Sequence, residues 1–293
     1  MKRILVFAYG LICYAAFLGT FLYLTAFLGN LFPVGSMDSP ATTPFWQALL
    51  IDALLVGVFG VQHSIMARPK FKKWWTRFVP EPMERSTYVM CSNLALVLFF
   101  WQWRPMGGMI WDVQDPVGRG IFHGLLLVGF LIVLVVTFLI NHFDLFGLRQ
   151  VWLYLRGKPY TSLAFSTPGP YKVIRHPMYV GWLMAFWATP TMTIAHLVFA
   201  VGMTIYILIV IWFEERDLVE FHGEAYADYR RKVPMLIPLP RGGERSSRTL
   251  QSLGKITAIV AATIGLTMFL MVLSGFFHPK VSAAATKWGH SAF

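Results

Sequence analysis

The sequence predicts an all-α membrane protein, a polytopic helix bundle with about seven helical segments in a single domain that covers residues 1–293. Hydrophobic residues make up 56% of the chain and charged residues only 13%, a composition that excludes a soluble domain with a polar surface. The hydrophobic residues gather in long runs, and most of the basic residues gather in alternate connecting segments. These patterns indicate a chain that crosses a membrane several times.

Most of the apolar runs approach the ~20 residues that a membrane-spanning helix requires. In order they are 4–28, 45–66, 88–103, 121–142, 178–189, 194–213 and 256–277. The fifth run is short and passes through "TPTM" (189–192) into the sixth, which predicts a short helical hairpin over 178–213 inside the bundle. The seventh belongs to an additional C-terminal membrane helix over about 255–277, after a long polar linker.

The basic residues predict the orientation of the chain in the membrane. Only four of the 25 Lys and Arg residues fall on one side of the predicted bundle, namely Arg104, Arg119, Lys280 and Lys287. By the positive-inside rule the N-terminus is cytoplasmic. The net charge of +11 is then explained by basic loops that face membrane lipids, so no nucleic-acid partner is expected. The oligomeric state is left open.

Two polar clusters flank the predicted hairpin. "RHPMY" (175–179) precedes its first helix and "FEERDL" (213–218) follows its second, so an antiparallel hairpin returns both clusters to the cytoplasmic face. Each residue alone could be an interfacial anchor or a cap. Together, an arginine, an imidazole, tyrosines and carboxylates beside a short hairpin predict a binding site, because ionisable groups at membrane depth are costly.

The residue types in these clusters suit a zwitterionic ligand with a further positive centre. Arg175 or His176 suits a carboxylate, a glutamate suits an ammonium group, and Tyr171 or Tyr179 suits a cation against its ring. S-adenosylmethionine has this profile. No G-x-G-x-x-G motif is present, so a soluble Rossmann-type methyltransferase is not expected.

The stretches "GPYKVIRHPMYVGW" and "FEERDLVEFHGEAYADYRRKVPMLIP" resemble the integral-membrane methyltransferases related to isoprenylcysteine carboxyl methyltransferase and phospholipid N-methyltransferases. Their pattern is RHPxYxG, a helical hairpin, then EExxLxxxFGxxYxxYxxxVPxxxP. One extra residue separates Phe221 from Gly223, so His222 receives no family role. The resemblance places the catalytic core at about residues 140–240. It implies that S-adenosylmethionine contacts Tyr171, Arg175, His176, Tyr179, Gly181, Glu214 and Glu215.

Two upstream stretches, "FGVQHSIMARPKFKKWWTRFVPEPMERSTYV" and "NHFDLFGLRQVWLYLRGKPY", are similar to a narrower group, the bacterial methanethiol S-methyltransferases. This similarity implies that a small thiol, methanethiol, is methylated to dimethyl sulfide, by an enzyme in the inner membrane of a bacterium. The thiol must lose its proton to become a competent nucleophile. We therefore expect His142 to accept the proton or Arg149 to stabilise the thiolate, with Asp144 orienting either, although caps and interfacial anchors would use the same residues.

Several alternatives remain open at this point. The same cofactor site would serve a methyltransferase that acts on an isoprenylcysteine carboxylate or a phospholipid amine. A membrane haem protein is suggested by the scattered histidines His63, His123 and His196. His63 and Ser64 fall at the cytoplasmic end of the second run and could instead line the same pocket. With only two cysteines, Cys13 and Cys91, neither a disulfide framework nor a cysteine metal site is expected.

Overall fold

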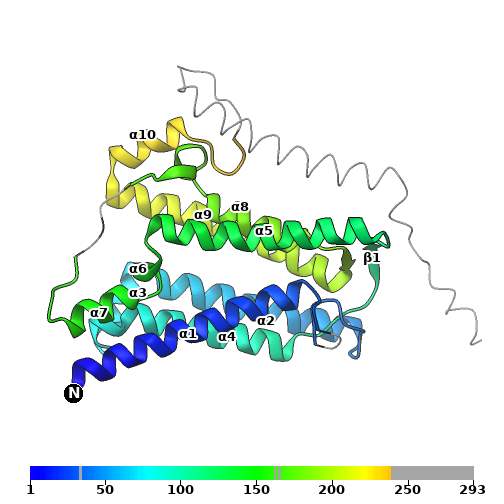
Figure 1. Cartoon of the computed structure of the whole chain (residues 1–293), viewed down its shortest axis with the longest axis horizontal. Helices are drawn as coiled ribbons and strands as arrows, with labels where there is room; N and C mark the ends of the chain where they lie inside the picture. Colours follow the sequence, from blue (N-terminus) through cyan, green and yellow to red (C-terminus); the bar gives the residue numbers. More distant parts are fainter. Residues whose placement is uncertain (33–34, 162, 164–165, 239–293) are drawn as a thin grey trace, which may run out of the picture.

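The structure is a computed structural model of the whole chain, and it describes residues 1–32, 35–161, 163 and 166–238. The C-terminal helix predicted at 255–277 lies outside the described residues. Within them the chain forms ten α-helices, one 3-10 helix and one pair of short strands (Figure 1). The prediction of an all-α membrane bundle is confirmed. Four of these helices are long and apolar enough to cross a membrane: α1 (Lys2–Leu28), α2 (Phe45–Ala67), α5 (Pro116–Ile140) and α9 (Ile194–His222).

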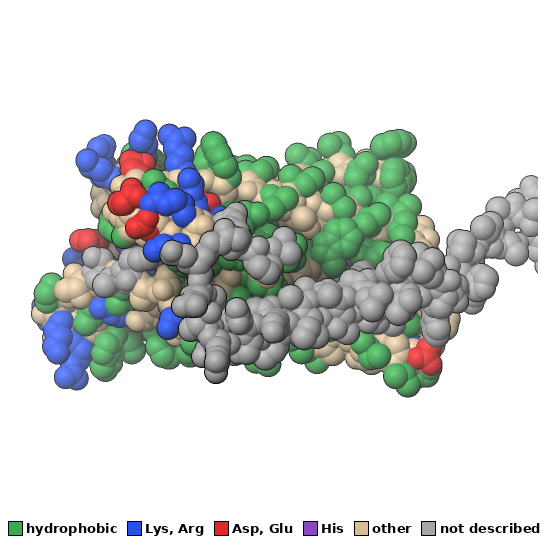
Figure 2. All heavy atoms as spheres, turned by 90° about the horizontal axis from the view of Figure 1, so that it is seen from above, with side chains coloured by type: hydrophobic (Ala, Val, Ile, Leu, Met, Phe, Trp, Pro, Cys, Tyr) green, Lys and Arg blue, Asp and Glu red, His purple; other side chains and the backbone are tan. Residues whose placement is uncertain are grey.

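The long helices lie side by side along one axis of the molecule (Figure 1). α4 (Glu81–Gln102) packs between α1 and α2, while α5 packs along α8 (Pro177–Trp187) in the most extensive helix contact. The short elements α3 (Pro69–Trp75), α6 (His142–Leu145), α7 (Leu148–Leu155), η1 (Gly169–Lys172) and α10 (Glu224–Lys232) lie at the end of the bundle that carries the N-terminus. We call this end the basic end, because Lys and Arg side chains gather there around α10 (Figure 2).

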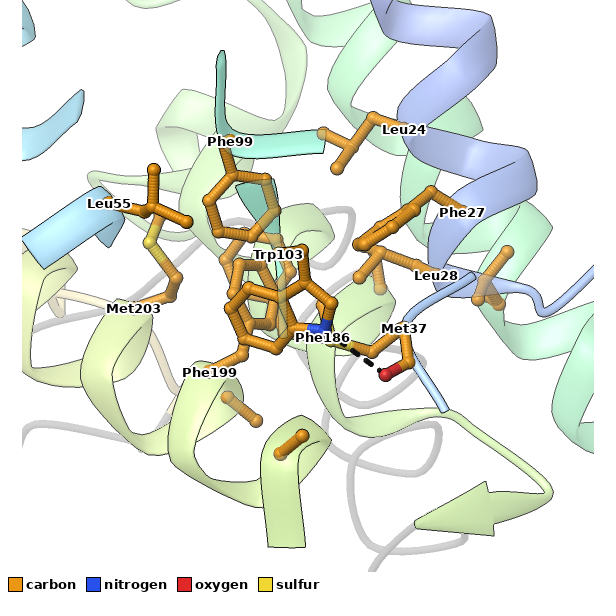
Figure 3. Close-up of a cluster of buried hydrophobic side chains, with 14 of the residues drawn as sticks. Leu24, Phe27, Leu28, Met37, Leu55, Phe99, Trp103, Phe186, Phe199 and Met203 are labelled. Carbon is orange, nitrogen blue, oxygen red and sulfur yellow. Dashed lines mark hydrogen bonds between the residues drawn. The ribbon is translucent and has the colours of Figure 1, made fainter. Parts of the chain in front are cut away.

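The hydrophobic core lies where α1 and α4 meet α8 and α9, toward the end of the bundle opposite the basic end. Phe27, Phe99, Trp103, Phe186 and Phe199 bring together aromatic rings from α1, α4, α8 and α9 (Figure 3). Aromatic pairs of this kind contribute about 0.5–1.5 kcal/mol beyond the burial of their area. The indole Nε1 of Trp103 donates to the carbonyl of Met37 at 3.2 Å, which gives the buried polar atom its partner.

The hairpin predicted at 178–213 is present as α8 and α9, with two differences. The "TPTM" segment is not a simple turn: β2 (Thr191–Thr193) pairs antiparallel with β1 (Met109–Asp112) at the end opposite the basic end. The second helix also continues nine residues past Phe213, to His222. Gly223 then reverses the chain with a φ of 58°, a conformation that favours glycine. The residue that is extra relative to the family pattern, between Phe221 and Gly223, therefore lies where α9 ends and α10 begins.

The fourth predicted run ends earlier than expected. Helix α5 stops at Ile140, and Asn141 has a φ of 142°, so His142 starts a separate short helix, α6. The side chain of Asn141 accepts a hydrogen bond from the backbone N–H of Asp144 at 3.1 Å, which caps that helix. The apolar run alone gave no signal for this break, because asparagine is tolerated within a helical pattern.

Candidate functional site

The two polar clusters predicted to meet do so at the basic end. Arg175 lies just before α8 and Glu215 lies in α9, and the Nε of Arg175 donates to Oε1 of Glu215 at 2.7 Å. The Nε2 atom of His176 lies 3.0 Å from the same oxygen. All three side chains are buried. Their proximity confirms that the antiparallel hairpin returns residues forty positions apart to one place.

Arg175 also fastens the chain that follows α10. Its Nη1 donates to the carbonyls of Arg230 at 3.0 Å and Val233 at 2.5 Å. The backbone N–H groups of Arg175 and His176 donate to the carbonyls of Pro234 and Met235. A buried guanidinium is tolerated because oxygen acceptors surround it. Sequence reasoning from side-chain chemistry missed this role of 230–235, since these hydrogen bonds are made to backbone carbonyls of that segment.

The carboxylate of Glu214, the residue before Glu215 in the chain, has a different environment from that of Glu215. Tyr179 donates its hydroxyl to Oε2 of Glu214 at 2.9 Å, and Nδ1 of His176 lies 3.9 Å from that oxygen. The side chain of Glu214 is 44% exposed, whereas that of Glu215 is 11% exposed. Adjacent residues point about 100° apart around a helix. Glu215 therefore forms the buried ion pair, and Glu214 presents a carboxylate at the surface of the same cluster.

Two further tyrosines complete the cluster on the side of η1 and α10. Tyr229 donates its hydroxyl to the carbonyl of Tyr171 at 2.6 Å. Burial, with the negative charge of Glu214 nearby, raises the pKa of the Tyr171 phenol. Burial also raises the pKa of Tyr229 to about 12. Both phenols are neutral hydroxyl groups at physiological pH, so Glu214 and Glu215 supply the negative charge in this cluster.

Gly181 lies in a helix contact. A Cβ placed on it would come within 2.8 Å of the carbonyl oxygen of Gly129 in α5, and a Cβ on Gly129 would come within 2.7 Å of the carbonyl of Gly181. Both distances are shorter than real Cβ contacts, so this pair of glycines permits the close approach of α5 and α8. The packing by itself explains the glycine that the family pattern shares.

The residues expected to act on the thiol are engaged elsewhere. His142 is 2% exposed, with Nε2 at 2.8 Å from the hydroxyl of Tyr14 and Nδ1 at 2.7 Å from that of Thr137. Its ring stacks on Phe138, with centroids 4.1 Å apart. Burial lowers the pKa of His142, so the imidazole is neutral. The geometry leaves neither ring nitrogen open to a substrate.

Asp144 and Arg149 are partners of each other. The Nη1 of Arg149 donates to Oδ1 of Asp144 at 2.8 Å and to the carbonyl of Thr161 at 2.9 Å. The guanidinium also lies over the ring of Tyr160, 5.2 Å from its centroid. These contacts tie α6 and α7 to the chain that leads toward η1. His142, Asp144 and Arg149 thus all lie at the basic end, but their hydrogen bonds are separate from those of Glu214 and Tyr179.

His63 and His196, two of the histidines that suggested a haem site, have separate sets of contacts. His63 in α2 contacts Tyr88 and Ser92 of α4, while His196 in α9 pairs with Asp38 near the opposite end. Across the described part of the chain, no group of three His, Cys, Asp or Glu side chains could hold a metal ion. His63 and His196 therefore each contact protein side chains.

Comparison with known proteins identifies the family. The sequence matches the NnrU protein family over residues 49–285. It is 58% identical to methanethiol S-methyltransferase from Crocosphaera subtropica, over 81% of this chain and 93% of that protein. It is 51% identical to the enzyme of the same name from Mycobacterium tuberculosis, over 82% of this chain and 98% of that protein.

A more distant relative is nurim from Rattus norvegicus, which is 28% identical over 67% of this chain and 76% of that protein. No solved structure matches the chain. The resemblance drawn from "RHPMY", "FEERDL" and the two upstream stretches is confirmed by these relatives. The chain belongs to the NnrU family and, within it, to the group of the methanethiol S-methyltransferases.

Proposed function

We propose that the protein transfers a methyl group from S-adenosylmethionine to methanethiol and releases dimethyl sulfide. The relatives that share about half of its residues carry the name methanethiol S-methyltransferase, which supports the acceptor. The observation that supports the methyl donor is the cluster at the basic end. There an exposed carboxylate, Glu214, and the hydroxyl of Tyr179 lie beside the buried Arg175–His176–Glu215 group.

The cluster fits the donor by the chemistry of its groups. Glu214 is the group for the ammonium of the donor, with a charge-assisted hydrogen bond. His176, whose Nδ1 faces Glu214, is the group for the carboxylate. The rings of Tyr171 and Tyr179 suit the sulfonium, since an aromatic face attracts a cation. Arg175 and Glu215 hold these residues in place through their own buried pair.

The methyl group of the donor is already activated by its sulfonium, so the protein has two tasks. One is to hold two small molecules in line and exclude water, which can lower a barrier by about 7–11 kcal/mol. The other is to remove the thiol proton. Because His142 is enclosed by hydroxyls and aromatic rings, it fits a structural role better than this second task.

We also propose that the site faces the cytoplasm of a bacterium, across its inner membrane. The cluster lies at the basic end, which the positive-inside rule places on the cytoplasmic side. A reporter fused to the N-terminus should therefore be active in the cytoplasm. Activity of that fusion only in the periplasm would reverse the orientation.

The test of function is a product analysis. Purified protein receives S-adenosylmethionine with methanethiol, hydrogen sulfide, a prenylated cysteine or phosphatidylethanolamine, and each methylated product is identified. We expect dimethyl sulfide from methanethiol. Methylation of only the prenylated cysteine or the phospholipid would replace the acceptor and keep the donor site. An intense haem absorption band in the pure protein, with no methylation of any acceptor, would overturn the proposal.

A further inference from the structure

Helix α2 packs against α9 along a line of residues that reaches the basic end. The α2 residues of this line, Gly60, Ser64 and Arg68, recur every four positions and so lie on one face of the helix. A Cβ on Gly60 would lie 3.1 Å from the ring of Tyr206 in α9, and the hydroxyls of Ser64 and Tyr206 are 3.1 Å apart. Small side chains at positions 60 and 64 let the two helices approach closely. Arg68 therefore meets the part of α9 that carries Glu214.

Arg68 lies at the break between α2 and α3. Its backbone is extended, with a ψ of 140°, as expected of the residue before a proline. Its Nη1 donates to Oδ2 of Asp217 in α9 at 2.5 Å. Its guanidinium also lies over the ring of Phe213, 4.7 Å from the centroid, where a cation is attracted to the aromatic face. One side chain of α2 therefore holds two residues of α9 that are one turn apart.

The two α9 residues that Arg68 holds lie on either side of Glu214 in the chain. Phe213 precedes Glu214, and Asp217 follows it by three positions, so the two carboxylates are neighbours on one face of the helix. From α8, Tyr179 donates its hydroxyl to Glu214 at 2.9 Å. This turn of α9 is therefore held by α2 through Arg68 and by α8 through Tyr179.

The carboxylates of this turn differ in the charge that each one faces. Glu215 forms its ion pair with Arg175, and Asp217 forms its ion pair with Arg68. Glu214 accepts instead from a tyrosine hydroxyl, and its side chain is 44% exposed. Because Arg68 neutralises Asp217, a cationic ligand that reaches this turn is directed to the carboxylate of Glu214.

We propose that Arg68 is a positioning residue for the methyl donor. Through Asp217 and Phe213 it holds the turn of α9 that presents Glu214 to the ammonium group of S-adenosylmethionine. The inference rests on the proposed function, because it assigns that ligand to Glu214. The side chains of Arg68 and Asp217 are 30% and 44% exposed, so their pair adds little to the stability of the whole protein. Its loss is therefore expected to change donor binding while the unfolding temperature stays nearly constant.

Calorimetric titration with S-adenosylmethionine tests this role in Arg68→Met and Asp217→Asn. Both should weaken binding, Asp217→Asn by about 2- to 5-fold and Arg68→Met, which also loses the contact with Phe213, by somewhat more. The shared direction is decisive, because the donor has two positive centres and one carboxylate. A purely electrostatic effect would tighten binding in Arg68→Met and weaken it in Asp217→Asn, and such opposite shifts would overturn the proposal. Arg68→Lys keeps the ion pair and should bind nearly as the unaltered protein does.

A second comparison shows whether Arg68 acts through Glu214. In a Glu214→Gln background, Arg68→Met should weaken binding no further, since coupled residues have non-additive effects. Arg231→Met is the matched control, because it removes an exposed arginine pair of α10 at the same end, and it should leave binding unchanged. Equal loss from Arg68→Met in both backgrounds, or no loss in either, would overturn the inference and leave the proposed function standing. Absence of donor binding by the unaltered protein would overturn both.

Discussion

Two buried pairs of histidine and carboxylate lie at opposite ends of the α8–α9 hairpin, and they differ in what surrounds them. Near β2, Nδ1 of His196 lies 2.8 Å from Oδ2 of Asp38. At the basic end, Nε2 of His176 lies 3.0 Å from Oε1 of Glu215. Residue type and burial are similar in both, so these properties alone do not separate a structural pair from a functional one.

In the pair near β2, both carboxylate oxygens and both ring nitrogens have hydrogen-bond partners. Both oxygens of Asp38 accept hydrogen bonds, Oδ1 from the backbone and hydroxyl of Thr193 and Oδ2 from Asn30 and His196. Nε2 of His196 faces the carbonyl of Phe186 at 3.1 Å, so both ring nitrogens have an acceptor. The loop before α2 is thereby joined to the start of α9. Nothing in this pair is presented to a ligand.

The pair at the basic end has a partly exposed neighbour. Glu214 adjoins Glu215 in the chain, lies at the surface of the cluster, and is bonded to Tyr179. We infer that an accessible charged group beside a buried pair, here the carboxylate of Glu214, distinguishes the proposed donor site from a structural pair. The following predictions separate the two ends, in order of expected effect.

Loss of the carboxylate near β2 should have the largest effect on stability. Asp38→Asn leaves His196 buried without its counter-charge, and breaking a buried pair costs about 3–5 kcal/mol. Thermal unfolding in detergent measures the loss. The control is Asp228→Asn, which removes an exposed ion pair with Arg231 and should change little. Equal stability of both variants would show that the Asp38 pair does not fasten the bundle.

A methyl group on Gly181 should have an intermediate effect. Gly181→Ala places a Cβ against the backbone of Gly129, and overpacking of this kind costs about 1–3 kcal/mol. Gly124→Ala in α5 is the control, because its Cβ would meet nothing within 4 Å. We expect a lower unfolding temperature for Gly181→Ala with unchanged affinity of the folded protein for S-adenosylmethionine. Loss of affinity for S-adenosylmethionine without loss of stability would instead support a place for Gly181 in the donor site.

Acid should weaken the end near β2 by a smaller amount. Burial raises the pKa of Asp38, but hydrogen bonds from His196, Thr193 and Asn30 outweigh it and hold the pKa below its ordinary value. A depressed carboxyl pKa contributes stability above the ordinary value and loses it as the pH falls through the folded value. Unfolding temperature should therefore drop below about pH 4. A similar drop in Asp38→Asn would assign it to other groups.

Much of this arrangement follows from the sequence, and the exceptions have physical causes. The apolar runs predicted the long helices, and the positions of "RHPMY" and "FEERDL" predicted that Arg175 and Glu215 meet. The break at Asn141 and the β1–β2 pair depend on local backbone conformation and on contacts between distant segments, which hydropathy does not record. His142 was selected for its chemistry at a helix end, yet only coordinates reveal that hydroxyls engage both of its nitrogens.

The most direct test of the central claim is a calorimetric titration with S-adenosylmethionine of the unaltered protein, Glu214→Gln and Glu220→Gln. Glu220 is an exposed glutamate of the same helix and serves as the control. Loss of a hydrogen bond to a charged group costs about 1.5–3 kcal/mol, so Glu214→Gln should weaken binding by about 10- to 100-fold. Glu220→Gln should bind as the unaltered protein does. Equal affinity in all three proteins would contradict the placement of the donor site at Glu214.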